Sequence, residues 1–479
     1  DDLLSTERCT HNMEYRWMDL KKRPVWIKCK GHLIRDAKMK PLYMIGCINE
    51  IGGKQKADNV SGLLGETGFR EYISNPVPTW KKGYLLRVGI DHFKEINEKF
   101  SMEYGDFILR ETAACISSCM SEKQRVYKLM ADEFLILDVS SDDTKEAGKL
   151  FIKIRESIDQ FVEENDFEVM YTISGGSLAL HSSENIEYSK VMKLTDFSLN
   201  EAKKRGRNRC YIFDEKDYSR FIRKGEITQE LREATRNGFQ GFVAFYQPVI
   251  EAKSGRLSGA ESLMRFSSSK FGMVSPVEFI PILEETGLII PVGRWMMKEA
   301  MEKCSQIRKV IPGFKVNINI SQVQVSKSDV IIDIADEMEK AGLSPEAMNI
   351  ELTESDLLEG DINTQHFLKE LKRMGIKLAL DDFGTGYSNF HYLSELDPEI
   401  IKIDRSFTSS AVADEKEYYL LKQFCRMIHN LGLKICIEGV ENQEEWAKIQ
   451  KLEPDFGQGF FWGRPCGYDE FVRQFIEKK

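Results

Sequence analysis

Several features are scarce or missing in this chain of 479 residues, and each absence excludes a class of protein. No run of about 18 apolar residues is present, which is the length that a membrane-spanning helix needs. The first residues, DDLLSTERCTHNMEY, lack the basic and apolar regions of a secretory signal. The 10 cysteines include no CxxC pair, so a disulfide framework is not expected. We therefore expect a cytoplasmic protein with reduced thiols and no membrane segment.

A net positive charge is also absent, because 67 Lys and Arg residues stand against 76 Asp and Glu residues and give a formal net charge of -9. Such a chain has no overall positive field to attract nucleic acid, so we expect no duplex DNA or RNA partner. The hydrophobic share of 42% is typical of a globular protein. A chain of this length is expected to form roughly two to four domains.

Residues 1–54 alternate apolar and polar side chains in YRWMDLKKRPVWIKCKGHLI and in PLYMIGCINEIG. This period of two predicts a few antiparallel strands joined by turns, which alone could not close a core. The stretch resembles the C-terminal half of a PAS sensor domain, including a polar exit at Gly52-Gly53-Lys54. We therefore expect a partial PAS domain here and a chain that starts inside a longer protein.

Residues 55–216 alternate helix-like and strand-like segments, which predicts an α/β domain. Four stretches, DNVSGLLGETGF, FKEIN, YGD and EAKKRGRNR, resemble the GGDEF family of diguanylate cyclases in this order. The resemblance implies contacts to the guanine or the phosphates of GTP at five positions: Lys94, Asn97, Asp106, Lys203 and Arg207.

The same domain departs from the GGDEF pattern where the chemistry should occur. The signature hairpin reads Met130-Ala131-Asp132-Glu133-Phe134, so side chains replace two glycines that let the backbone approach a triphosphate. Gly89 stands where the family has its first metal-binding Asp, and the inhibitory RxxD motif is absent at 121–124. We expect no cyclase activity, which leaves either regulatory GTP binding or a structural, dimerising role.

Residues 217–238 are charged throughout and predict a connecting helix. Eight strand-like segments follow in 239–479, separated mostly by helix-length stretches, which is the count of a (β/α)8 barrel. The ends of six of these strands supply residues that bind metals or handle protons: Glu261, Asn319, Glu351, Asp381 with Asp382, Lys402 and Glu438. Oxygen ligands of this kind suit Mg²⁺ or Mn²⁺, and clustered carboxylates without a cation would repel one another.

Residues 226–479 resemble the EAL family of cyclic-di-GMP phosphodiesterases in motif after motif. The name-giving motif reads Glu261-Ser262-Leu263, with Ser in place of Ala, and NINIS, ELTES, DDFGTGYS, KID, EGVE and QGFFWGRP follow in family order. The resemblance implies two divalent cations, Mg²⁺ or Mn²⁺, held by Glu261, Asn319, Glu351, Asp381 and Asp382. Among the catalytic residues, it assigns the nucleophilic water to Lys402 and Glu438 and the support of the DDFGTGYS loop to Glu354. It assigns the substrate contacts to Gln247, Leu263, Arg265, Glu441 and Gln458.

The sequence thus predicts a metal-dependent phosphodiesterase that hydrolyses cyclic di-GMP to linear pGpG. The expected architecture is α/β, with a C-terminal EAL barrel, a central degenerate GGDEF domain and N-terminal PAS-like strands. Families of this kind form homodimers, and GTP would be an allosteric ligand of the central domain. Two alternatives remain at this point: a non-catalytic cyclic-di-GMP receptor, and a metal-dependent barrel enzyme of small-molecule metabolism.

Overall fold

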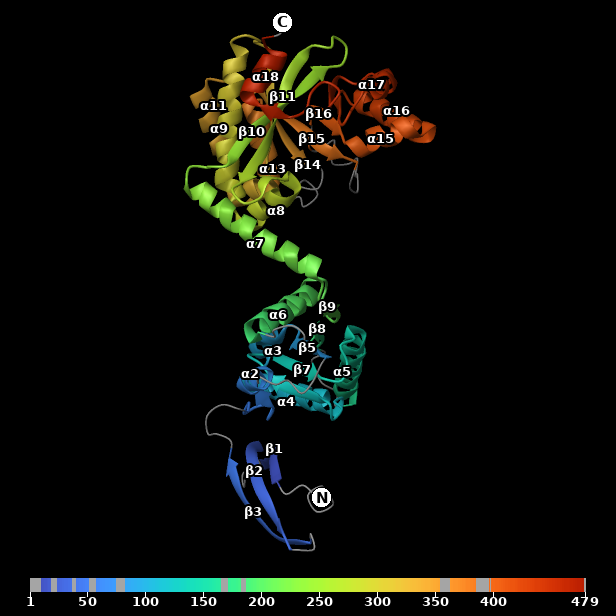
Figure 1. Ribbon diagram of the computed structural model, residues 1–479. Helices are drawn as coiled ribbons and strands as arrows, with labels where there is room; N and C mark the ends of the chain where they lie inside the picture. Colours follow the sequence, from blue (N-terminus) through green and yellow to red (C-terminus); the bar gives the residue numbers. More distant parts are fainter. Residues whose placement is uncertain are drawn as a thin grey trace. The chain divides into compact units, whose positions relative to one another are not determined.

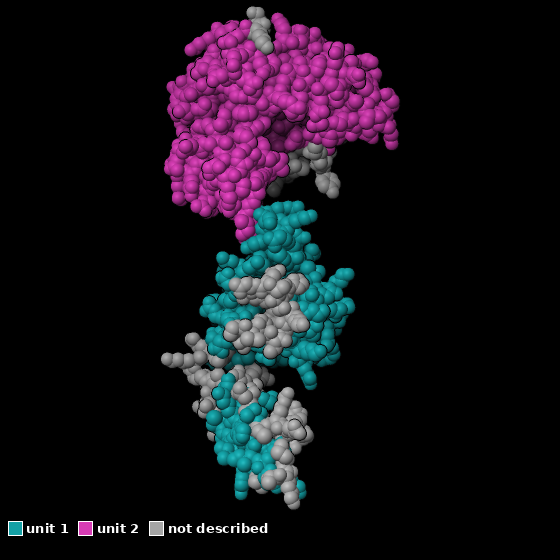
Figure 2. All heavy atoms as spheres, viewed as in Figure 1, with its two compact units in different colours: residues 1–220 teal, residues 221–479 magenta. Residues whose placement is uncertain are grey.

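The computed structural model describes residues 10–18, 24–36, 40–50, 57–74, 82–164, 171–181, 187–353, 362–384, 396 and 398–477. The chain divides into two compact units, residues 1–220 and residues 221–479 (Figure 2). Each unit has its own hydrophobic core and is described by itself. No helix among the described residues combines the length and the apolar character needed to cross a bilayer.

The N-terminal part of the first unit is an antiparallel sheet of three strands in the order β1-β2-β3 (Figure 1). The strands are β1 (Thr10–Met18), β2 (Pro24–Arg35) and β3 (Pro41–Glu50). The antiparallel strands expected in 1–54 are therefore present. Their assignment to a PAS domain stays a prediction.

The central domain is a six-stranded sheet in the order β4-β6-β7-β5-β8-β9, with helices on both faces. Neighbouring residues of the central strand point to opposite faces, so Leu86 packs with α4 and α5 while Leu85 packs with α2 and α6. The elements are β4 (Leu64–Gly65), α2 (Glu66–Ile73), β5 (Lys82–Ile90), α3 (Phe93–Lys99), α4 (Met102–Ser118), β6 (Gln124–Lys128), β7 (Glu133–Asp138), α5 (Thr144–Glu164), β8 (Ile173–His181), α6 (Tyr188–Lys204) and β9 (Cys210–Ile212).

Helix α7 (Glu215–Arg236) contains the boundary between the two units. Most of its residues are polar or charged, but Ile227 and Leu231 are fully buried and belong to a hydrophobic core cluster of the second unit. The Arg223 guanidinium also forms two hydrogen bonds with the Glu278 carboxylate, at 2.6 and 3.0 Å. A helix is thus present where the sequence predicts a connection over 217–238.

The second unit is a closed barrel, as the strand count predicted. Its ring runs β10-β11-β13-β14-β15-β16-β17-β18 and closes because β10 pairs with both β11 and β18. The strands are β10 (Phe242–Glu251), β11 (Leu257–Ser268), β12 (Gly272–Val274), β13 (Lys315–Asn319), β14 (Met348–Thr353), β15 (Lys377–Phe383), β16 (Ile400–Ile403), β17 (Lys434–Ile437), β18 (Phe456–Gln458) and β19 (Cys466–Gly467).

Helices cover the outside of this barrel in the described residues (Figure 1). They are α8 (Pro276–Thr286), α9 (Ile289–Arg308), α10 (Gln322–Lys327), α11 (Val330–Ala341), η1 (Pro345–Ala347), α13 (Ile362–Met374), α15 (Arg405–Ala413), α16 (Glu415–Asn430), α17 (Gln443–Ile449), η2 (Gln450–Leu452) and α18 (Tyr468–Phe475). The first barrel strand differs from a regular β/α barrel, because β10 is antiparallel to both of its neighbours. Strands β11 and β13 to β18 are parallel, so their carboxyl ends meet at one mouth.

Candidate active site

The pairing register of the barrel brings the predicted polar residues to the same mouth. Asn319, the last residue of β13, lies opposite Glu351 in β14. In the next pair, Thr353 lies opposite Asp381. Lys402 follows in β16, and Glu438 comes directly after β17. Side chains that are far apart in sequence therefore face one another because consecutive strands end together.

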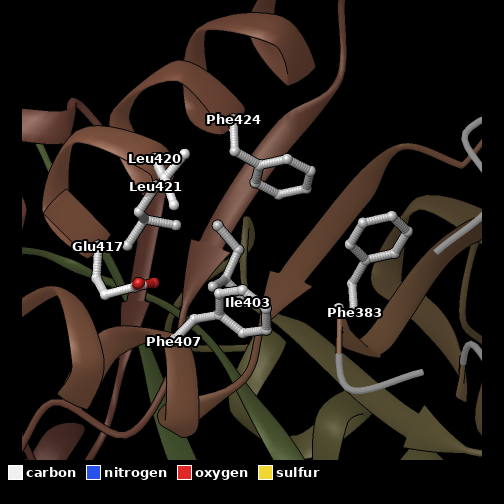
Figure 3. Close-up of a pocket in the computed structure, with 8 residues that line it drawn as sticks. Phe383, Ile403, Phe407, Glu417, Leu420, Leu421 and Phe424 are labelled. Carbon is white, nitrogen blue, oxygen red and sulfur yellow. The ribbon is translucent and has the colours of Figure 1, made fainter. Parts of the chain in front are cut away.

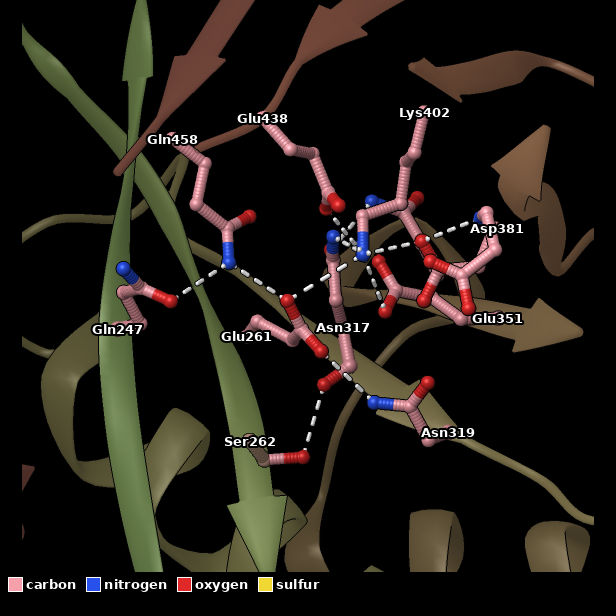
Figure 4. A network of polar contacts seen from close by, with 12 residues as sticks. Gln247, Glu261, Ser262, Asn317, Asn319, Glu351, Asp381, Lys402, Glu438 and Gln458 are labelled. Atoms are coloured by element: carbon pink, nitrogen blue, oxygen red, sulfur yellow. Dashed lines mark hydrogen bonds and ion pairs between the residues drawn. The ribbon is translucent and has the colours of Figure 1, made fainter. Parts of the chain in front are cut away.

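The Lys402 ammonium lies at the centre of this group (Figure 4). Its side chain is only 1% exposed, and Nζ has a carboxylate oxygen within reach on each of four residues. The distances are 2.8 Å to Glu438 Oε1, 2.9 Å to Glu351 Oε2, 3.0 Å to Asp381 Oδ1 and 3.2 Å to Glu261 Oε2. One positive charge thus faces four acids in a water-poor interior, so the site has an excess of negative charge.

Amide side chains hold the Glu261 carboxylate in place. Gln458 Nε2 donates to Glu261 Oε2 at 2.6 Å, and Asn319 Nδ2 donates to Oε1 at 2.9 Å. Gln458 Nε2 also lies 3.1 Å from Oε1 of Gln247. The oxygen of the Gln458 amide, Oε1, is buried and has no hydrogen-bond partner among the described residues, so it can accept a bond from a ligand.

A second chain of amides holds Glu351. Asn317 Nδ2 donates to Glu351 Oε1 at 2.7 Å, and Asn349 Nδ2 donates to Asn317 Oδ1 at 2.8 Å. All three side chains are buried, with residue exposures of 0% for Glu351, 4% for Asn349 and 7% for Asn317. The contact to Asn349 did not follow from the sequence, because it depends on the cross-strand register of β13 and β14.

The protonation of the cluster differs from residue to residue. Burial raises the pKa of Glu438 to about 8, with Lys402 opposing the shift and Asp381 adding to it. Burial and the neighbouring Asp381 raise the pKa of Asp382 to about 6. Burial and Glu261 also raise the pKa of Glu351 well above its usual value. Some carboxyls of the cation-free site therefore carry protons near neutral pH.

Glu261 and Lys402 shift in the directions that favour their charged forms. Burial alone would raise the pKa of Glu261, but Lys402 and the amide donors outweigh it, and the pKa lies below its usual value. Burial alone would lower the pKa of Lys402, but Asp381 and the other carboxylates hold it well above its usual value. In the cation-free site Lys402 is therefore held in its charged form.

The carboxylates form two groups that could each hold a metal ion. The first is Glu261, Glu351 and Asp381, and the second is Asp381, Asp382 and Glu438; in each group the ligand atoms lie within 4.8 Å of one another. Asp381 belongs to both groups, so two cations, one in each group, could share its carboxylate. The donors are all oxygen atoms, which fits hard divalent cations such as Mg²⁺ or Mn²⁺.

A cavity of about 210 Å³ opens onto this cluster. Of the predicted substrate contacts, its lining includes Gln247, Leu263, Glu441 and Gln458. Arg405 also lines the cavity and forms an ion pair of 2.6 Å with Glu441, a contact that the sequence argument missed. Phe460 lines it too and is 40% exposed, with the Arg464 guanidinium 4.1 Å from its ring centre.

Among the described residues, four of those predicted for the barrel site do not line this cavity: Arg265, Asp382, Asn319 and Glu351. Arg265 is half-buried, donates to the Met264 carbonyl at 2.8 Å and lies 5.7 Å from the centre of the Phe245 ring. Asp382 is exposed and has a left-handed backbone, with a φ of 52°, and its amide donates to Asp381 Oδ1 at 3.0 Å. Glu354 and the TGYS part of the DDFGTGYS motif lie outside the described residues.

A second cavity, of about 190 Å³, lies behind the carboxyl end of β15 (Figure 3). Its lining is apolar except for Glu417 and comes from β15, β16, α15 and α16: Phe383, Gly384, Ile403, Phe407, Glu417, Leu420, Leu421 and Phe424. This cavity offers no group of polar side chains for a charged substrate. Its apolar lining residues lie behind β15, the strand that carries Asp381 and Asp382.

The predicted GTP contacts of the central domain lie on three of its helices and one loop. Lys94 and Asn97 are in α3, Asp106 is in α4, Lys203 is in α6 and Arg207 follows that helix. Lys94 and Asp106 are exposed, and Lys94 forms an ion pair with Glu98 at 3.4 Å. In the hairpin between β6 and β7, Met130 is 79% exposed and Ala131 has a left-handed φ of 51°.

Comparison with known proteins identifies the two folded regions. Residues 55–209 match the diguanylate cyclase GGDEF domain, and residues 228–465 match the EAL domain. The chain contains a GGDEF domain and an EAL domain. The GGDEF-EAL chain is 25% identical to a solved cAMP-bound form of the EAL enzyme Bd1971, with a TM-score of 0.50 over 62% of this chain and 79% of that chain.

Two curated relatives carry both regions of similarity. MucR of Pseudomonas aeruginosa, named a bifunctional diguanylate cyclase and cyclic di-GMP phosphodiesterase, is 29% identical over 86% of this chain and 59% of its own length. PdeR of Escherichia coli, named a cyclic di-GMP phosphodiesterase, is 26% identical over 88% of this chain and 64% of its own length. The GGDEF-EAL chain thus spans about three-fifths of the length of these relatives.

Proposed function

We propose that the EAL barrel hydrolyses one phosphodiester bond of cyclic di-GMP and releases linear pGpG. The observation that carries the proposal is the pair of carboxylate groups that share Asp381 beside the buried Lys402. Relatives named for cyclic-di-GMP hydrolysis, such as PdeR, support the choice of substrate. A barrel enzyme of small-molecule metabolism would not account for the adjoining GGDEF domain.

The donor set fits two divalent cations. Glu261, Asn319, Glu351 and Asp381 would hold one, and Asp381 with Asp382 the other; Mg²⁺ and Mn²⁺ suit these oxygen donors. When bound, such a pair supplies charge neutralisation of the phosphodiester and a lower pKa for a water molecule. The excess of acids over Lys402 is the reason why the site should take up cations.

Lys402 and Glu438 are placed to handle the proton of the attacking water. Their side chains lie 2.8 Å apart, so a proton can pass between Nζ and Oε1 without movement of the backbone. The pKa of about 8 at Glu438 is near the working pH, which suits a general base. Glu354 keeps the role that the family resemblance implies, as support for the DDFGTGYS loop.

The cavity lining is suited to the ends of a dinucleotide. Gln458 presents a buried amide oxygen without a partner, which can accept from a guanine N–H. Phe460 presents an exposed ring on which a base can stack. Arg405 and Arg265 supply positive charge near the mouth, while Gln247, Leu263 and Glu441 complete the wall.

The main alternative is a receptor that binds cyclic di-GMP without cleaving it. Chromatography of cyclic di-GMP incubated with the purified protein distinguishes the two: we expect pGpG with Mg²⁺ or Mn²⁺ and none with EDTA. Calcium should inhibit, because it prefers more ligands at longer distances. Turnover that continues in EDTA would contradict the metal-dependent reaction. Tight binding without product in Mn²⁺ would favour the receptor.

For the GGDEF domain we propose a regulatory role without cyclase activity, with GTP as the ligand. This rests on the residues of this chain, since the relative MucR is named for both activities. Gly89 provides no carboxylate, and Met130 and Ala131 place side chains in the hairpin that the family keeps free. The homodimer and the cytoplasmic location expected from the sequence stay predictions.

A further inference from the structure

The GGDEF domain has a lysine beside Gly89, the position that matches a metal-binding Asp in the resemblance to its family. A Cβ atom built on Gly89, near the end of β5, would lie 3.1 Å from Lys203 Nζ and 3.4 Å from its Cε. Lys203 comes from the last turn of α6, and its Nζ is 3.9 Å from Asp132 Oδ2. The ammonium therefore lies in contact with the place that a side chain at position 89 would occupy, and near the remaining acid, Asp132.

The other carboxylates around this place already have cationic or hydrogen-bonding partners. Arg87 binds Glu133 Oε2 through Nε at 2.7 Å and through a terminal nitrogen at 2.5 Å. The buried Asp91 accepts hydrogen bonds of 2.8 Å from the hydroxyls of Thr172 and Ser174. Among the described residues, groups of three convergent metal ligands occur only in the barrel. The residues of this cleft therefore do not fit a divalent cation.

We infer that the cleft binds a nucleoside triphosphate without a divalent cation, with the Lys203 ammonium in direct contact with the phosphates. This inference rests on the GTP binding proposed above and adds its metal requirement. The ion pair of Lys203 with Asp132 is long, at 3.9 Å, and its side chain is 26% exposed, so the ammonium can turn to an incoming anion. A charge-assisted contact to phosphate is stronger than such a pair.

A divalent cation on the phosphates would not improve this binding. It would lie beside the ammonium of Lys203, and like charges at short range repel in a partly buried cleft. It would also find Glu133 held by Arg87 and Asp91 held by hydroxyl groups. Binding should therefore be at least as tight in EDTA as in Mg²⁺, which is the opposite of a cyclase site that uses metal.

The guanine end of the cleft also shows an unused polar group. Asn97 Oδ1 is buried and has no hydrogen-bond partner among the described residues. It lies against Gly105, where an added Cβ would be only 1.8 Å away, so the glycine is what lets the Asn97 amide lie over α4. Asp106 is the next residue of that helix. A base with N–H donors, such as guanine, matches this pair of acceptors.

Calorimetric titration of the full chain with GTP, once in EDTA and once in excess Mg²⁺, tests the inference. We expect binding in EDTA that is as tight as, or tighter than, binding in Mg²⁺. Lys203→Met should weaken binding in EDTA by about 10- to 100-fold, as loss of a charged hydrogen bond does. Lys204→Met is the matched control, because that side chain is 64% exposed and pairs with Glu201; it should bind as the parent does.

Asn97→Ala should remove the heat of GTP binding, which would assign that heat to the GGDEF cleft and not to the barrel. Tighter binding in Mg²⁺ than in EDTA would overturn the inference. So would an unchanged affinity in Lys203→Met, or no binding at millimolar GTP in either buffer. None of these outcomes affects hydrolysis of cyclic di-GMP, which is measured separately by chromatography.

Discussion

The two domains both place a lysine against carboxylates, but in opposite proportions. In the EAL barrel, Lys402 has carboxylate oxygens of four residues within 3.2 Å, and its side chain is 1% exposed. In the GGDEF domain, Lys203 has Asp132 at 3.9 Å, and the neighbouring Glu133 is bound by Arg87. Four acids face one cationic side chain in the first case, while Asp132 and Glu133 each face a cationic side chain of their own in the second.

On the functions proposed above, this difference separates a site that takes up metal from a site that binds GTP without it. Unbalanced carboxylates in a buried place raise one another's pKa until protons or cations arrive. A lysine and an arginine that face the acids remove that need, because the chain supplies the positive charge itself. The balance of charges around each lysine therefore says more about metal binding than the presence of acidic motifs does.

The largest expected effect is that of Lys402→Met on the barrel. Removal of the ammonium takes away the group that shares a proton with Glu438, so kcat should fall by about 10²- to 10⁴-fold. Binding of cyclic di-GMP should remain measurable by calorimetry in Ca²⁺. Lys377→Met is a control, because Lys377 pairs with Glu399 away from the cavity lining. A near-normal kcat in Lys402→Met would remove the assigned role.

Glu261→Gln should reduce metal affinity and turnover together. Glu261 belongs to the first carboxylate group and accepts hydrogen bonds from Gln458 and Asn319. Replacing its carboxylate with an amide removes the charge and keeps the size of the side chain. Calorimetry with Mn²⁺ should show weaker binding, and saturating Mn²⁺ should restore part of the rate. Glu399→Gln serves as the control outside this group. Loss of turnover with unchanged Mn²⁺ affinity would count against a ligand role.

Asn317→Leu should have a smaller effect on the same measurements. Loss of a residue that hydrogen-bonds to a metal ligand typically lowers metal affinity or activity by about 10- to 100-fold. Asn317 donates to Glu351 and receives from Asn349, so we expect Mn²⁺ affinity to fall within that range. Asn200→Leu, on the exposed side of α6, is the comparison. An unchanged Mn²⁺ affinity would show that Glu351 does not depend on this amide.

Metal affinity of the barrel should decrease as the pH falls. The pKa values of about 8 at Glu438 and about 6 at Asp382 are raised, so these carboxyls are protonated below those values in the cation-free protein. A cation must displace these protons, so the apparent affinity for Mn²⁺ should fall by about tenfold per pH unit below 8 and more steeply below 6. Calorimetry in buffers of different ionisation heat measures the released protons. Constant affinity between pH 6 and 8 would contradict this.

The smallest expected effect is that of restoring the GGDEF hairpin. Met130→Gly with Ala131→Gly should still give no cyclic di-GMP from GTP, because Gly89 would supply no carboxylate and Lys203 would keep its place. The assay is best run with the Lys402→Met barrel, so that any product is not degraded. Formation of cyclic di-GMP in this variant would show that the missing ligand at position 89 is dispensable.

The sequence predicted the barrel and the gathering of acidic side chains at its strand ends, because each is carried by a local motif or a strand count. It did not predict that β10 runs antiparallel, since strand direction depends on tertiary pairing. Arg405 and Asn349 were missed for a related reason: their roles come from Glu441 and from Asn317, which lie elsewhere in the chain. The position of the Lys203 side chain beside Gly89 was not predicted either, because it depends on how α6 packs against β5.

The barrel closes through strand β18, whose pairings with its two neighbours are short. Strand β18 pairs with β17 through two residue pairs and with β10 through three, whereas β10 and β11 pair along nine. A short seam has few hydrogen bonds to break, so thermal fluctuations should part the wall there first. Gln458 belongs to that seam and also grips Glu261. Transient loss of the β18 pairings would therefore free the Glu261 carboxylate from Gln458 while the other strands of the barrel stay paired.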